Sequence, residues 1–117
     1  MQMLVVDDDV ELRDVIAACL RSHGHSVLLA DSADDAIAAV DRHGMPEAVV
    51  LETGSDGDTL LHRLRQRVPN LPALVLTGLR NPADLARITS GRVGCLAKPF
   101  TGAELFRAVG KLSAAVA

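Results

Sequence analysis

The chain has 117 residues, of which 49% are hydrophobic, and its formal net charge is −3. This length predicts one domain with its own core over residues 1–117, and the small charge excludes a nucleic-acid-binding tail or a polybasic membrane patch. The apolar runs are too short to span a bilayer, and no signal-peptide pattern begins the chain. Cys19 and Cys95 have no metal-like spacing, which favours free buried thiols in a cytoplasmic protein.

The first predicted elements are a strand at about residues 2–6 and a helix that follows it. The strand is the apolar run before three successive aspartates. The helix places apolar side chains at the i, i+3, i+4, i+7 and i+8 spacing of one buried face. These side chains are Leu12, Val15, Ile16, Cys19 and Leu20. Gly24 is expected to end the helix, and Asp9 to cap its beginning.

The second pair of elements has the same form. Residues 26–30 predict a strand, and Ser32 can cap a helix that ends near Gly44 and Pro46. The inward side chains of this helix are expected to be Ala36, Ile37 and Val40. A third strand covers 48–51 and ends at Glu52.

The remaining elements continue this alternation. A short polar turn over 53–57 precedes a third helix, which ends at Pro69, and Pro72 opens a fourth strand that ends at Thr77. Residues 81–89 predict a short fourth helix with proline at its first position. A fifth strand covers 93–97, and Thr101 caps a last helix. The inward side chains of the third and last helices are Leu60, Leu61, Leu64, Val68, Leu105, Val109 and Leu112.

Five strand–helix units of this size predict an α/β fold with an open, doubly wound, five-stranded parallel sheet. Parallel crossovers are right-handed and place helices on both faces of the sheet. We expect the flavodoxin-like strand order 2-1-3-4-5, one of the common doubly wound arrangements.

Polar residues follow four of the predicted strands. Asp7 and Asp8 follow the first, Glu52 ends the third, Thr77 ends the fourth and Lys98 follows the fifth. Ligands of open parallel sheets bind outside the carboxyl ends of the strands, so these groups are expected to converge on one site. Singly, an acidic cluster can be a solvated turn, a threonine a strand-end hydroxyl and a lysine a surface charge. Together they predict an acidic crevice with one ammonium group.

Over nearly its whole length the chain resembles the response-regulator receiver domains of two-component phosphorelays. The matching motifs are Leu4-Val5-Val6-Asp7-Asp8-Asp9, Leu76-Thr77-Gly78 and Lys98-Pro99-Phe100. The segments 71–78 and 96–100 are most similar to receivers attached to hybrid histidine kinases.

The resemblance implies a role for each matched position. Asp7 and Asp8 would hold Mg²⁺ together with Glu52 and the backbone carbonyl of Gly54. Glu52 stands where the family has the aspartate that accepts a phosphoryl group. Thr77 would contact a phosphoryl oxygen and switch position, and Lys98 would neutralise another oxygen. Pro99 would follow a cis peptide bond.

Three departures from the family pattern bear on function. Glu52 is one methylene longer than aspartate, and its carboxylate is expected to reach toward Lys98 and form an internal ion pair. The turn after Glu52 lacks about three residues that the family carries, which weakens the Mg²⁺ site at Gly54. Cys95 occupies the position where many receivers have a switching aromatic residue. Asp56 and Asp58 lie beyond the strand end, where helix capping is the better interpretation.

These features predict an atypical, phosphorylation-independent receiver domain that is not an enzyme and binds Mg²⁺ weakly or not at all. Its expected partner is a histidine kinase or a downstream signalling protein, reached directly or through a domain outside these residues. A homodimer through the fourth helix, fifth strand and fifth helix would be the family-like assembly. One alternative is a conventional phosphorylatable receiver of a hybrid kinase. The other is a haloacid-dehalogenase-like phosphatase, which needs an acidic pair after the lysine, whereas only Glu104 follows Lys98.

Overall fold

The structure, a computed structural model, describes residues 1–52, 55–78 and 93–116. Five strands and four helices are assigned in these residues. The strands are β1 (Gln2–Val6), β2 (Ser26–Ala30), β3 (Ala48–Glu52), β4 (Ala73–Thr77) and β5 (Val93–Ala97). The helices are α1 (Val10–Ser22), α2 (Ala33–His43), α3 (Ser55–Arg67) and α5 (Gly102–Val116). The expected helix over residues 81–89 lies outside the described residues.

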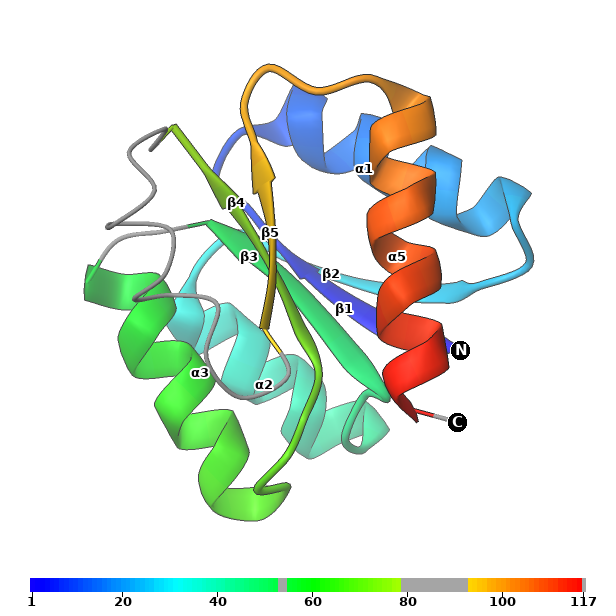
Figure 1. The fold of residues 1–117 in the computed structure, drawn as a ribbon. Coiled ribbons are helices and arrows are strands. Elements are labelled where there is room, and N and C mark those ends of the chain that lie inside the picture. The colour runs from blue at the N-terminus through cyan, green and yellow to red at the C-terminus, as the bar shows by residue number, and fades with distance from the viewer. Residues whose placement is uncertain (53–54, 79–92, 117) are drawn as a thin grey trace.

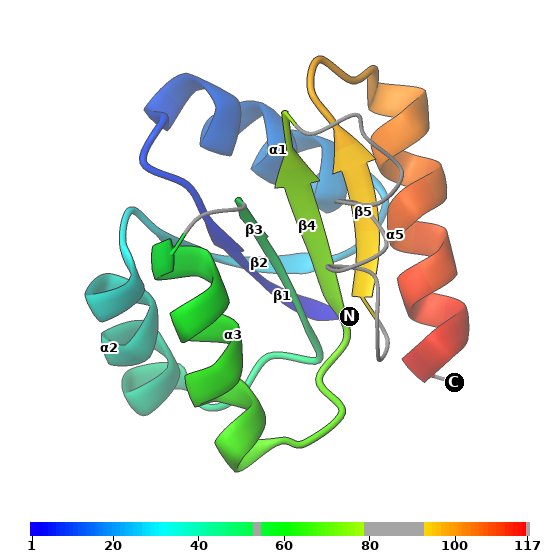
Figure 2. The same cartoon turned by 60° about the vertical axis from the view of Figure 1, so that its left-hand side comes forward.

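The strands form one parallel sheet in the order β2-β1-β3-β4-β5. This is the expected doubly wound α/β arrangement. Helices α1 and α5 cover one face of the sheet, and α2 and α3 cover the other (Figure 1). In Figure 2, β4 and β5 lie side by side with their arrowheads toward the same end of the molecule. The carboxyl ends of the parallel strands therefore share one edge of the sheet.

Two hydrophobic cores lie on the two faces of this sheet, because successive strand residues point to opposite faces. In β1, Met3 and Val5 join the core under α1 and α5, whereas Leu4 joins the core under α2 and α3. The residues of the inner strands β1, β3 and β4 are largely buried on both faces, which explains why these strands read as unbroken apolar runs. The largest fully buried side chains include Leu20, Leu60, Leu64, Leu74 and Leu105.

Local sequence signals fix the beginnings and ends of the helices. The side chain of Asp9 accepts a hydrogen bond from the amide of Leu12, and that of Ser32 accepts one from Asp35, as expected for N-caps. Gly24 and Gly44 follow α1 and α2 with φ of +88° and +90°, a conformation that glycine adopts without strain. These residues therefore fix where α1 and α2 begin and end, and so where the chain continues into β2 and β3.

Two details of the sequence prediction were wrong. Val15 was assigned to the buried face of α1, but its side chain is 63% exposed, whereas Ile16, Ala17 and Leu20 are buried. Residues 15 and 16 point about 100° apart on a helix, and Val15 falls beyond the margin of the face that the sheet covers. Helix α3 begins at Ser55, so the polar turn predicted over 53–57 is shorter than expected.

The two cysteines are free, but both are half-buried rather than fully buried. In Cys95, burial raises the pKa of the thiol above its ordinary value. No helix in the described segments has the length and apolar character needed to cross a membrane.

Candidate functional site

Asp7 follows β1 directly and is one of the few buried polar residues, with only 3% of its surface exposed. Its backbone amide donates to the carbonyl of Ala30, 3.1 Å away, which fixes the turn against β2. Its Oδ1 accepts a hydrogen bond from the amide of Asp9 at 2.9 Å. Its Oδ2 is buried without a hydrogen-bond partner among the residues that the structure describes. A buried, unsatisfied carboxylate oxygen is costly, and it marks this position for a ligand or a cation.

Three carboxylates meet at the carboxyl edge of the sheet. Asp7, Asp8 and Glu52 each offer an oxygen atom, and these atoms all lie within 4.8 Å of one another. Asp8 is exposed and Glu52 half-buried, so the group opens from the core toward solvent. The first and third strands are neighbours in the sheet, with Val6 beside Leu51, and this register brings the two strand ends together.

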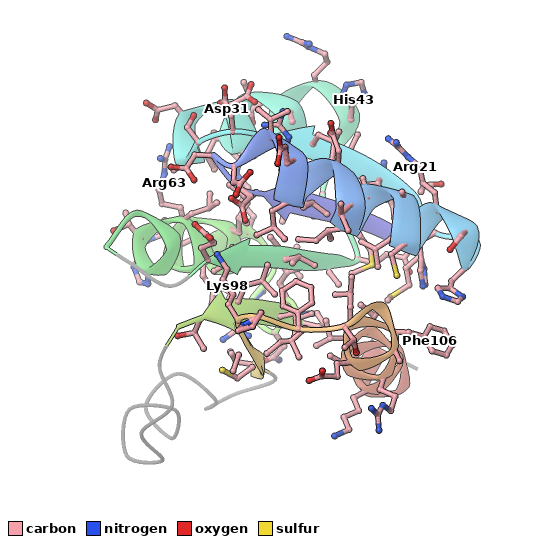
Figure 3. The ribbon with its side chains drawn as sticks, turned by 90° about the horizontal axis from the view of Figure 1, so that it is seen from above. Arg21, Asp31, His43, Arg63, Lys98 and Phe106 are labelled. Carbon is pink, nitrogen blue, oxygen red and sulfur yellow. The ribbon has the colours of Figure 1, made fainter. Side chains whose placement is uncertain are left out.

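Lys98 completes the site from the other side. Its ammonium group forms an ion pair with Oε1 of Glu52, and both side chains are about two-thirds buried, with 31% and 33% exposed. The backbone amide of Lys98 donates to the carbonyl of Thr77 at 2.7 Å, which holds the residue against the end of β4. In Figure 3 the Lys98 side chain extends across this end of the sheet. The ion pair therefore links the carboxyl ends of β3 and β5, which lie on either side of β4 in the sheet.

The pKa of Asp7 is raised above its ordinary value of 3.8. Burial is the main cause, because desolvation disfavours the charged carboxylate, and the nearby charges of Asp8 and Asp9 add to it. The hydrogen bond from the Asp9 amide and the positive charge of Lys98 act in the opposite direction. The raised pKa shows that burial and the neighbouring carboxylates outweigh the stabilising effect of Lys98 and the Asp9 amide on the charged form of Asp7.

The other predicted site residues fall into three groups. Thr77 is buried at the end of β4, beside Ala97 of β5, and so stands next to Lys98. Cys95 lies two residues before the end of β5, opposite Val75, and the peptide bond between Lys98 and Pro99 is cis. Gly54 lies outside the described residues, as do the side chains of Asp56 and Asp58.

One residue near the site was not singled out from the sequence. Arg13, in the first turn of α1, places Nη1 3.4 Å from the backbone carbonyl of Asp7. Its Nε is buried without a hydrogen-bond partner in the described segments. The sequence offered one signal, an arginine in the first helical turn directly after an acidic cluster, where a positive charge is unfavourable for the helix dipole.

The donor set suits a hard divalent cation, because it consists only of oxygen atoms and includes the unsatisfied Oδ2 of Asp7. Asp7, Asp8 and Glu52 are the residues that would hold Mg²⁺, which would supply positive charge for a phosphoryl group. The ammonium of Lys98 already neutralises one of the three carboxylates. The same lysine and the buried Thr77 are the groups that could contact an anion entering the crevice.

The chain belongs to the response regulator receiver domain family, whose pattern matches residues 3–110. Among curated proteins it is 36% identical over 107 residues to the probable transcriptional regulatory protein TcrX of Mycobacterium tuberculosis. That match covers 88% of this chain and 45% of TcrX, so the chain spans about half the length of that relative. It is 34% identical to an uncharacterised 14.6 kDa protein of Leptolyngbya boryana, covering 93% of this chain and 87% of that protein.

Solved structures agree with this assignment. The receiver domain of NtrX from Brucella abortus has a TM-score of 0.81 and 33% identity, covering 94% of this chain and 96% of that one. A response regulator receiver protein from Sinorhizobium medicae has a TM-score of 0.84 and 26% identity, covering 100% and 97% of the two chains. The chain is thus a receiver domain of the kind found in response regulators of two-component signalling, a family of signalling domains that typically bind Mg²⁺ at an acidic cluster.

Proposed function

We propose that this chain is an atypical receiver domain that signals without accepting a phosphoryl group, and that it is not an enzyme. The observation that carries the proposal is the ion pair between Glu52 and Lys98. Glu52 occupies the end of β3, where the family resemblance places the acceptor aspartate. Its carboxylate is held by the amine that would otherwise meet an incoming phosphoryl oxygen.

The extra methylene of Glu52 supports this proposal on geometric grounds. Phosphoryl transfer depends on positioning and on stabilising developing charge, with little other chemistry for the protein to supply. A displacement of about 1 Å at the reacting centre can lower the rate on the order of a hundredfold. A carboxylate engaged by Lys98 is both displaced toward β5 and less available as a nucleophile. The side chain itself thus takes the place that a phosphoryl group would fill.

The acidic crevice is proposed to bind Mg²⁺ only weakly. Asp7 and Asp8 retain the acidic pair, which favours a cation, but Glu52 is already paired with Lys98. A cation would have to compete with an ammonium group for the third carboxylate. We therefore expect Mg²⁺ to bind only at millimolar concentration.

The direct test compares the protein with its Glu52→Asp variant. Both are incubated with Mg²⁺ and acetyl phosphate, and acyl phosphate is measured by intact-protein mass spectrometry. Because aspartate restores the shorter arm, we expect the variant to be labelled and the wild-type chain to reach less than about a hundredth of that rate. Asp7→Asn in the Glu52→Asp background is the matched control, since it should abolish labelling by weakening the cation site.

Stable phosphate on Glu52 of the wild-type chain would refute the proposal and restore a conventional receiver, such as that of a hybrid kinase. Loss of labelling in both proteins would instead place the defect in the short loop after β3 rather than in Glu52.

Output is proposed to pass through a protein partner, a histidine kinase or a downstream signalling protein. The positions of Thr77 and Cys95 support this route, because both lie on the strands beside Lys98. With no aromatic residue at Cys95, a change in the Glu52–Lys98 pair would be transmitted through the backbone contact between Lys98 and Thr77. Pairing of two copies through the fourth-helix, β5 and α5 face remains the family-like proposal, and part of that face lies outside the described residues.

A further inference from the structure

Strand β2 forms an open edge of the sheet. Among the residues that the structure describes, it pairs only with β1. The amide of Ser26 donates to the carbonyl of Met1 at 2.9 Å, and the carbonyl of Ala30 accepts from Asp7 at 3.1 Å. Alternate residues of a strand direct their backbone groups to the same side, so Leu28 also faces β1. Val27 and Leu29 therefore direct their backbone N–H and C=O groups outward, ready to pair with another strand.

A hollow of about 310 Å³ runs along this edge, between β2 and α2. Its middle is apolar, with Leu28 of β2 facing two small side chains of α2, Ala38 and Ala39. Val27, Leu28 and Leu29 of β2 are only half-buried, as are most residues of the other outer strand, β5, whereas the inner strands β1, β3 and β4 are largely buried. The small alanine side chains leave room for a segment to approach the strand edge.

The two ends of this hollow carry opposite charges. Arg21 and Arg42, in the last turns of α1 and α2, lie toward the beginning of β2, and His43 follows Arg42 there. Asp31 and Asp35 lie toward its end, where Oδ2 of Asp35 accepts a hydrogen bond from the Asp31 amide at 3.1 Å. Figure 3 shows Arg21 and His43 at one end of this side of the molecule and Asp31 at the other.

These charges have no ion-pair partner among the described residues. The salt bridges that α2 forms within the described residues use other side chains, Asp34 with Arg63 and Asp41 with Arg67. Cations in a last helical turn favour the helix dipole, which explains why basic residues suit those positions. That effect does not account for an apolar strand edge left open between a cationic and an anionic end.

We propose that this edge pairs with β2 of a second copy of the chain, antiparallel, about a two-fold axis through Leu28. In this register Val27 of each copy lies opposite Leu29 of the other, and each such pair exchanges both backbone hydrogen bonds. The antiparallel direction places the cationic end of one hollow beside the anionic end of the other. The surface is therefore self-complementary, as an isologous two-fold interface requires.

The distribution of charge selects a second copy over an acidic peptide from another protein. An acidic segment would satisfy Arg21 and Arg42 but would meet Asp31 and Asp35 at the far end of the same groove. A copy of this chain supplies both signs in the required order. The small contact of five-residue strands predicts weak, concentration-dependent association rather than a permanent dimer.

The test is a charge exchange across the proposed axis, followed by sedimentation velocity from micromolar to millimolar chain concentration. Arg42→Glu and Asp35→Lys should each weaken self-association about tenfold, because symmetry repeats each repulsive contact twice. An equimolar mixture of the two variants should restore association, since each repulsive pair becomes attractive in the mixed dimer. Circular dichroism verifies that both variants fold, and Asp31→Lys replaces Asp35→Lys if the latter does not.

Arg107→Glu, on α5 and away from β2, is the control with the same change of charge and should associate like the wild-type chain. A wild-type chain that stays monomeric at millimolar concentration would overturn the proposal, as would a mixture that fails to restore association. Equal weakening by Arg107→Glu would assign the dimer to the α5 face instead. A monomer that binds a glutamate-rich peptide would assign the groove to an acidic partner and also overturn it.

Discussion

At the scale of single residues, the fold buries the carboxylate of Asp7 at the end of β1. Asp7 has a raised pKa because it is buried and lies near Asp8 and Asp9. Folded Asp7 therefore holds its proton more tightly than unfolded Asp7, and protonation favours the folded state. This contribution is fully present below the ordinary value of 3.8 and is lost as the pH rises through the raised value. Above the raised value, where Asp7 is charged, its carboxylate destabilises the domain.

Replacing Asp7 with asparagine removes this charge but keeps an oxygen that can accept from the Asp9 amide. We expect Asp7→Asn to raise the free energy of unfolding at neutral pH by on the order of 1 kcal/mol, with no gain below the ordinary pKa of an aspartate. Urea unfolding followed by circular dichroism at several pH values measures this. Asp14→Asn, at an exposed position of α1, is the control and should change stability little. A destabilised Asp7→Asn at neutral pH would contradict the account of crowded charge.

At the scale of elements, the beginning of α5 depends on a reciprocal cap. Oγ1 of Thr101 accepts from the Glu104 amide at 3.1 Å, and the Thr101 amide donates to the Glu104 carboxylate at 3.3 Å. This capping box follows directly after Lys98, Pro99 and Phe100, so it also fixes how the chain leaves the site. Neither partner is buried, and the contribution comes from satisfying amides at the helix terminus.

Thr101→Ala should therefore lower the free energy of unfolding by about 1 kcal/mol, the usual loss for an N-cap. Ser22→Ala is the matched control, because the Ser22 hydroxyl donates to the Cys19 carbonyl of its own helix, at the exposed end of α1. Chemical unfolding measures both. Equal losses in the two variants would show that α5 does not rely on this cap.

The position of the sheet against helix α1 determines which apolar side chains of the helix are buried. Leu20 is buried in the core under α1 and α5, whereas Val15 is largely exposed and lines a surface hollow with Leu12 and Cys19. Truncation of a buried leucine leaves a cavity, and truncation of an exposed valine does not.

We expect Leu20→Ala to lower the free energy of unfolding by about 2–5 kcal/mol and Val15→Ala by less than about 0.5 kcal/mol. Thermal or urea unfolding of the two variants tests whether Val15 lies outside the buried face of α1, as the structure has it, or within it, as the sequence predicted. A comparable loss at both positions would mean that Val15 is covered in solution.

At the scale of the whole molecule, a ligand that binds only the folded state stabilises every element together. Mg²⁺ at the acidic crevice would tie the end of β1 to the end of β3, which are neighbours in the sheet. Its effect on unfolding therefore measures how far Lys98 competes for the site.

With about 10 mM Mg²⁺ we expect the wild-type chain to gain less than about 0.5 kcal/mol, corresponding to a dissociation constant near 10 mM or above. Lys98→Ala should gain more, because Glu52 is released from its ion pair. Lys111→Ala, exposed on α5, should respond like the wild-type chain. A wild-type gain above about 1.4 kcal/mol would mean submillimolar binding and would argue against competition by Lys98.

The sequence by itself determined the five strands, their termini and the helices that are described, because apolar period and capping residues act over a few neighbouring positions. Strand ends at Asp7, Glu52, Thr77 and Lys98 therefore indicated one site, since parallel strands share an edge. Only the tertiary structure decided which apolar residue of α1 lies outside the core. It also decided that, within the described residues, Oδ2 of Asp7 has no hydrogen-bond partner and that β2 forms an open edge with a cationic and an anionic end. These properties depend on which surfaces meet across the sheet, and no local pattern of residues specifies that.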